Sequence, residues 1–178
     1  AANINDGVYL RLTAREAGEK REFYVDSVQL TVYYTRNVTV STTGSQTASM
    51  DIPSTDQYVG GAFVITENTG SRNVTGITIT EHGSVDAQND LANIRLYYDL
   101  DTSAPYDCTD ESFSGFPSPT ESQFGATVAG GFTSADGTAT FTDSEGISTT
   151  QTMCVYVVLD VESGATPNET LEIKIDDP

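Results

Sequence analysis

The strongest structural signal in this sequence is the run Met153-Cys154-Val155-Tyr156-Val157-Val158-Leu159. The run is apolar at odd and even positions alike, so both faces of an extended chain are hydrophobic. It is rich in β-branched and aromatic residues, which favours a strand over a short helix. The pattern predicts a central strand, which we place at residues 152–161.

Shorter Thr-rich segments with alternating apolar residues lie on both sides of this strand. Residues expected to face inward from these segments are Ile77, Ile79, Ile94, Leu96, Tyr98, Leu171, Ile173 and Ile175. The expected strands are residues 38–42, 46–52, 58–66, 74–81, 92–99, 138–142, 152–161 and 169–176. Strands at this spacing, separated by Gly and Asn/Asp, predict an all-β fold, an immunoglobulin-like antiparallel β-sandwich.

Residues 100–136 depart from this rhythm, because they are rich in Pro, Gly, Ser and acids. A loop of this length inside a compact domain is usually functional or pinned by a covalent or metal link. Cys108 lies in it, and the second cysteine, Cys154, lies in the predicted central strand. The two form either a disulfide or a pair of free thiols. The disulfide is the favoured interpretation, and it predicts an oxidising, extracellular setting and a stabilisation of about 4 kcal/mol.

The charge of the chain is divided between two segments. Residues 1–37 carry five bases and five acids, whereas residues 38–178 carry three bases and twenty-one acids, so the second segment holds the whole net charge of -18. This shift predicts two structural units, residues 1–37 and 38–178. The first unit is too short to bury a core of its own, since chains below about 40 residues usually need a partner or cross-links.

The first unit reads as a β-hairpin with one apolar face. The residues of that face are Val8, Leu10, Leu12, Val28, Leu30 and Val32. Either the hairpin adds two strands to its own domain, or it completes a sheet of a neighbouring subunit by strand addition. Repeated head to tail, the second arrangement builds a filament, a homo-polymer whose subunit interface is this apolar face.

Several function classes are disfavoured by composition. The single histidine, His82, has the setting of a turn residue, and no Ser-His-Asp or Cys-His arrangement accompanies it, so we expect no enzyme. The acidic charge would repel nucleic acid and anionic membranes. No apolar run is long enough to span a membrane, so we expect no membrane insertion.

Three further patterns suggest ligands or modification. Calcium is the one candidate cofactor, because acids cluster at Asp99, Asp101, Asp107, Asp110 and Glu111. The spacing differs from an EF-hand, and a solvated acidic loop is the favoured interpretation. Tyrosines expected to be exposed at Tyr33, Tyr97 and Tyr106 suggest a carbohydrate-stacking platform, but tryptophan is absent and tyrosine is ordinary on an edge strand. Glycosylation triplets begin at Asn37, Asn73 and Asn168.

Four stretches of residues 38–178 carry a resemblance to a known family, namely Tyr58–Phe63, Asn73–Ile79, Leu96–Asp99 and Cys154–Asp160. With these stretches, residues 38–178 resemble an Ig-like module repeated in very large surface proteins of uncultured bacterial lineages. Residues 8–34 look like the closing hairpin of a different β-sandwich, and the organisation is similar to subunits of donor-strand filaments. The resemblance implies a structural subunit of an extracellular filament or fibrous adhesin at a cell surface. The alternative is a calcium- or carbohydrate-binding module of a surface protein.

Overall fold

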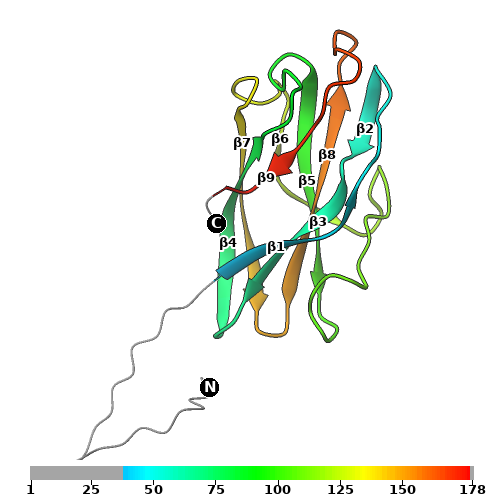
Figure 1. Ribbon diagram of the computed structural model, residues 1–178. Helices are drawn as coiled ribbons and strands as arrows, with labels where there is room; N and C mark the ends of the chain where they lie inside the picture. Colours follow the sequence, from blue (N-terminus) through cyan, green and yellow to red (C-terminus); the bar gives the residue numbers. More distant parts are fainter. Residues whose placement is uncertain (1–37, 177–178) are drawn as a thin grey trace, which may run out of the picture. The chain divides into compact units, whose positions relative to one another are not determined.

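The computed structural model describes residues 38–176 (Figure 1). The chain divides into two units, Ala1–Thr35 and Arg36–Pro178, and the described residues belong to the second. The hairpin expected in residues 1–37 lies outside them. Residues 38–176 are all-β and include no helix, and so none that crosses a membrane.

In residues 38–176, nine strands form two antiparallel sheets that face each other as the layers of a sandwich (Figure 1). In spatial order, the larger sheet contains β1 (Val38–Gln46), β3 (Gly60–Glu67), β8 (Thr152–Val161), β5 (Leu91–Asp101) and β6 (Ser122–Val128). Its sixth strand, β2 (Ser54–Tyr58), also pairs with β8. The smaller sheet contains β7 (Thr138–Ser148), β4 (Ser71–Glu81) and β9 (Ile173–Lys174) in that order.

The central strand predicted at residues 152–161 is confirmed as β8, which has both faces buried. Val155 and Leu159 point into the core between the sheets, where they join Ile77 and Ile79 of β4. Cys154, Tyr156 and Val158 alternate with these residues, point to the opposite face of the sheet and belong to a second, smaller apolar cluster. The two clusters explain why the run is apolar at every position.

Strands β2 and β3 follow the same edge of β8 and are separated by a bulge. Tyr58 pairs with Val158 and Phe63 with Val155, so the bulged chain uses more residues than its partner over this stretch. Gly60 lies in the bulge with φ 93°, and a Cβ there would be 2.4 Å from the Thr47 backbone nitrogen. Only glycine allows β1 to pass this close, because a side chain would collide with backbone.

The structure corrects two of the expected boundaries near the beginning of the fold. The strand expected at residues 46–52 is wrong, because β1 continues to Gln46 and residues 47–53 belong to no strand. The Thr47 N–H bonds the Val59 carbonyl beside the bulge, so the chain leaves the β1 ladder at this point. The strand expected at residues 58–66 is interrupted at Val59 for the same reason.

Later boundaries also differ. Residues 100–136 are not one continuous loop, because β6 lies inside them with Phe124 fully buried. Strand β7 runs beyond the expected 138–142 to Ser148. The strand expected at 169–176 is reduced to the pair Ile173–Lys174, although Ile173 faces inward as predicted.

Candidate functional site

The two sides of the sandwich differ in how the sheets meet. On one side, the edge strands β6 and β7 lie close together, and the Gly125 N–H donates to Asp143 Oδ2 at 3.0 Å. On the other side, the edge of the larger sheet is β1 and the edge of the smaller sheet is β4 with the short β9. Within residues 38–176, β1 makes no comparable approach to β4 or β9. We call this second side the open seam.

Both sheets have unpaired strand edges at the open seam. Strand β1 pairs only with β3 among the described strands, so its other edge is free over nine residues. Strand β4 pairs with β9 only at Thr80 and Glu81, and Ser71–Ile79 has no described partner on that edge. Free backbone N–H and C=O groups on a sheet edge are a template for an additional strand.

The C-terminal segment, residues 171–175, forms the far wall of the open seam. Two hydrogen bonds hold this segment against the end of β4. The Glu172 N–H donates to Oε1 of the fully buried Glu81 at 3.0 Å, and the His82 N–H donates to the Glu172 carbonyl at 2.8 Å. These bonds hold the C-terminal segment against the end of β4 at Glu81 and leave the β4 edge from Ser71 to Ile79 uncovered.

Three hollows follow one another along β1 in the open seam. The first, of about 320 Å³, is lined by Val38, Val40, Ile65, Val74, Ile77 and Ile175 among others. The second, also about 320 Å³, extends from Thr42 to Gln46 and includes Phe63 and Ile173. The third, of about 340 Å³, continues from Gln46 past Met50 and includes Leu171. The first two lie beside successive parts of β1, and the third shares Gln46 and Val59 with the second and continues past the end of β1. We refer to the three together as the groove.

The rim of this groove is apolar and incompletely covered. Six half-buried apolar residues that pack against the main core lie along it, namely Val38, Val40, Met50, Val74, Leu171 and Ile175. Only three other half-buried apolar residues pack against that core in the described part of the chain. The incomplete cover of the core is therefore concentrated at the open seam.

The free edge of β1 lacks two of the usual protections against pairing. Natural edge strands carry charged residues or proline, are short, or are bulged. The ladder of β1 with β3 shifts register between Thr43 and Gln46, so its regular part is Val38–Thr43. The β1 sequence, Val38-Thr39-Val40-Ser41-Thr42-Thr43-Gly44-Ser45-Gln46, contains no charge and no proline. This is notable in a segment that holds a net charge of -18, and it leaves the strand able to accept a partner.

The predicted disulfide Cys108–Cys154 is present, and it anchors a loop to the outer face of the larger sheet. Phe113 from that loop packs on Tyr58, Tyr97 and Tyr156, with ring centroids 4.9, 5.7 and 5.6 Å away. The loop therefore covers the second apolar cluster.

The carbohydrate-stacking platform is wrong in part, because its tyrosines are not all exposed. Tyr97 is only 9% exposed and lies under this loop. Tyr106 is half-buried, and Tyr33 lies outside the described residues.

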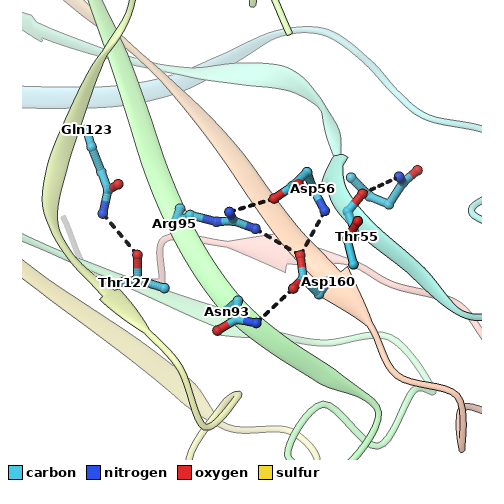
Figure 2. A network of polar contacts seen from close by, with 8 residues as sticks. Thr55, Asp56, Asn93, Arg95, Gln123, Thr127 and Asp160 are labelled. Carbon is cyan, nitrogen blue, oxygen red and sulfur yellow. Dashed lines mark hydrogen bonds and ion pairs between the residues drawn. The ribbon is translucent and has the colours of Figure 1, made fainter. Parts of the chain in front are cut away.

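A polar network on the same outer face joins three strands (Figure 2). Arg95 of β5 donates from Nη1 to Asp56 Oδ1 of β2 at 2.6 Å and from Nη2 to Asp160 Oδ1 of β8 at 2.9 Å. Asp160 also accepts the Asp56 N–H and the Asn93 side chain, each at 2.8 Å. The guanidinium lies 4.7 Å from the centre of the Phe116 ring. The β2–β8 ladder shifts register between Ser54 and Gln57, and the β5–β8 ladder shifts between Ala92 and Arg95. The network lies at both of these shifts.

Hydrogen bonds control the ionisation of this network's central acid. Burial alone would raise the pKa of Asp160, but the bonds from Asp56 and Asn93, together with the charge of Arg95, outweigh it and lower the pKa. Asp160 therefore stays ionised at neutral pH, and its charge is matched by Arg95. The network fastens β2 to the sheet, and none of the three hollows includes its residues.

Two of the five acids of the calcium hypothesis accept hydrogen bonds from the loop, each from different donors. Asp101 accepts the N–H groups of Ser103 and Cys108, at 2.9 and 3.0 Å, and Asp107 accepts the Thr109 N–H and hydroxyl. Among residues 38–176, no group of three or more acid, His or Cys side chains is arranged to hold a metal ion. Asp99, Asp101, Asp107, Asp110 and Glu111 thus do not form a calcium site in the described structure.

Two carboxylates of the loop region have opposite pKa shifts. Burial, then the nearby charges of Glu121 and Glu111, raise the pKa of Asp99 to about 6. Burial also acts to raise the pKa of Glu121, but hydrogen bonds from Ser114 and Ser118 outweigh it and lower the pKa to about 2. Glu121 accepts from Ser114, Ser118 and Thr120, so it closes the loop as an ionised acceptor.

The remaining candidate residues lie apart from one another. Asn73 is exposed on β4 and donates to Ser144 Oγ at 3.1 Å, and Asn168 is exposed with φ 71°. Asn37 lies outside the described residues, as do the six residues of the expected subunit interface. His82 follows β4 directly, and its Nε2 is 2.9 Å from Asp176 Oδ2. Neither residue of this exposed pair lies in one of the three hollows.

The sequence did not reveal the open seam itself. Alternation at Val38 and Val40 indicated a strand, but whether its second edge is paired depends on residues far away in sequence. The lack of charge in β1 was the one local signal.

The chain matches no protein-family model, no curated protein and no solved structure.

Proposed function

We propose that the protein is a structural subunit of an extracellular filament or fibrous adhesin, and that its subunits join by strand addition. The observation that carries the proposal is the open seam: two sheets with free edges on the same side and an apolar groove between them. An added strand would satisfy the free backbone groups of β1 and cover the half-buried rim. In this proposal the two-layer fold is an immunoglobulin-like sandwich, and residues 1–37 are the donor.

Two further features support the proposed setting. The Cys108–Cys154 disulfide fits an oxidising compartment such as the cell surface. The main grooves of the described structure are lined by apolar and hydroxyl residues with few titratable groups, which supports a binding surface for a polypeptide and not a catalytic centre. A calcium- or carbohydrate-binding module is the competing class, and neither the separated acids nor the buried Tyr97 favours it.

The test is the assembly state of the full chain, purified with its disulfide intact. Sedimentation velocity over a series of protein concentrations should give a ladder of species that are integral multiples of the subunit mass. Negative-stain electron microscopy of the same samples should show fibres of uniform width. A chain that remains monomeric at every concentration, with no fibres, would contradict the proposed function.

A further inference from the structure

We propose that the groove of the open seam accepts residues Val28–Tyr34 of a second copy of this chain, added as a strand to the free edge of β1. This inference rests on the proposed function, and it specifies both the acceptor and the donor. The acceptor is described above. The donor is identified by its sequence pattern, its length, its charge and the point at which it joins the described structure.

The sequence pattern of the donor matches an edge with one buried face. Apolar residues alternate with Gln29, Thr31 and Tyr33, and the apolar set is Val28, Leu30, Val32 and Tyr34. In an added strand, alternate side chains point to opposite faces. The apolar set would therefore lie over the two hollows beside β1, and the polar set would face solvent.

The lengths also agree. The donor has seven residues, and six steps of about 3.3 Å make it about 20 Å long. Strand β1 has nine residues, and the hollows extend along it from Val38 to Gln46. A seven-residue strand therefore covers the first two hollows without extending beyond β1, and the third hollow, which continues from Gln46 past Met50, lies beyond it. The other apolar stretch, Val8–Leu12, is shorter and includes the charged Arg11, so it fits less well.

Charge is compatible with this donor. Residues 27–34 carry no charge, and neither does β1, so pairing them buries no unpaired ion. The segment 1–37 is neutral as a whole, whereas residues 38–178 carry -18. Two copies of the acidic sandwich repel each other, and a neutral connector brings them together with less repulsion.

The short connection favours a second copy over the chain's own β1. Only Thr35, Arg36 and Asn37 separate the donor from Val38, where β1 begins. A strand that folded back on its own β1 would need a three-residue hairpin loop, and such loops place Gly at the left-handed position. This connection contains no glycine. Donation to another copy needs no such turn.

The experiment uses two full-length variants that each disable one half of the joint. Leu30→Asp puts a charge on the donor's apolar face, and Val40→Asp puts one on the groove rim. Thr42→Asp is a second acceptor variant, because Thr42 is exposed and lines the same groove, so its loss of assembly is not a folding defect. Controls are Thr13→Asp in the N-terminal segment and Thr127→Asp on β6, the opposite edge strand.

Each disabled variant alone should sediment as a monomer, and both controls should form fibres as the unaltered chain does. An equimolar mixture of Leu30→Asp and Val40→Asp should give dimers and stop there, because only one donor and one acceptor remain intact in each pair. The same mixture with Thr42→Asp in place of Val40→Asp should behave identically.

The outcomes separate this inference from the proposed function. Fibres from Leu30→Asp or Thr42→Asp, or a mixture that stays monomeric, would overturn the assignment of donor and groove while the filament itself stands. A second result would overturn both this inference and the proposed function. If the unaltered chain is monomeric and its open seam becomes accessible to protease only in Leu30→Asp, then Val28–Tyr34 occupies the groove of its own chain.

Discussion

Gly125 of β6 and Asp143 of β7 connect the two sheets through a backbone N–H to carboxylate hydrogen bond of 3.0 Å. This contact lies on the side of the sandwich opposite the open seam. Gly125 has φ 71°, and a Cβ there would lie 3.1 Å from the backbone nitrogen and oxygen of Thr142. The close approach of β6 and β7 therefore requires glycine, and it makes this side closed while the other side stays open.

Replacing Gly125 with alanine should lower the free energy of unfolding by about 1–3 kcal/mol, because the added Cβ strains the left-handed backbone and pushes against β7. Gly130→Ala is the matched control, since a Cβ at Gly130 meets nothing within 4 Å. Thermal denaturation followed by circular dichroism measures both variants. Equal melting temperatures for the two variants would show that the closed side does not depend on Gly125.

Removing Arg95 should destabilise the fold strongly, because it leaves Asp56 and Asp160 close together without their cation. The expected loss for Arg95→Ala is about 3–5 kcal/mol by urea unfolding. Asp56→Asn in the same chain should restore part of that loss, because it removes one of the two unpaired charges. Losses that simply add in the double variant would mean that the network in Figure 2 is not energetically coupled.

Loss of the disulfide should release the loop that covers the outer aromatic cluster. Cys108 and Cys154 are separated by 46 residues in sequence, and closing such a loop stabilises by about 4 kcal/mol in the chain-entropy model. The Cys108→Ala/Cys154→Ala double variant should unfold at lower urea concentration. Limited proteolysis should cut first near Phe113, which packs on the covered face. An unchanged urea midpoint would contradict this role for the bond.

Asp99 should make the fold less stable as the pH rises from about 4 to about 6. Its pKa is about 6 in the folded chain against an ordinary value of 3.8, so the folded state binds the proton more tightly than the unfolded state. Stability from this group is therefore complete below about pH 4 and is lost as the pH passes through 6.

Asp99→Asn removes the ionisable group and should raise the melting temperature at pH 7 but not at pH 4. After allowance for solvent screening, the gain at pH 7 is on the order of 1 kcal/mol, or roughly 2–4 °C. The comparison ends at pH 4 because Glu121, with its pKa lowered to about 2, loses its stabilising charge at lower pH. A variant with the same gain at both pH values would mean that Asp99 is not the titrating group.

The sequence predicted those parts of the fold whose signal is local. Strand β8 was placed correctly because its apolar residues occupy both faces, and β4 and β5 because Ile77, Ile79, Ile94 and Leu96 alternate with polar residues. Strand β6 was missed, since Phe124 is its one fully buried residue and Gly125 interrupts the extended pattern.

Contacts between residues that are far apart in sequence could not be predicted from these alternation patterns. Arg95 bonds residues 39 and 65 positions away in sequence, so nothing near it identifies its partners. Asp101 and Asp107 are close in sequence but accept hydrogen bonds from separate backbone groups of the loop. The open seam depends on strand edges that come together only in the folded sheets.

Amide hydrogen exchange of assembled and monomeric protein tests the strand-addition account most directly, with Leu30→Asp as the monomer. In fibres of the unaltered chain, peptides covering Val28–Tyr34 and β1 (Val38–Gln46) should gain protection together, because each supplies the backbone partners of the other. Peptides covering β6 should change little, because that side is closed. Fibres in which β1 exchanges as fast as in the monomer, or in which the new protection lies on β6 and β7, would contradict the account.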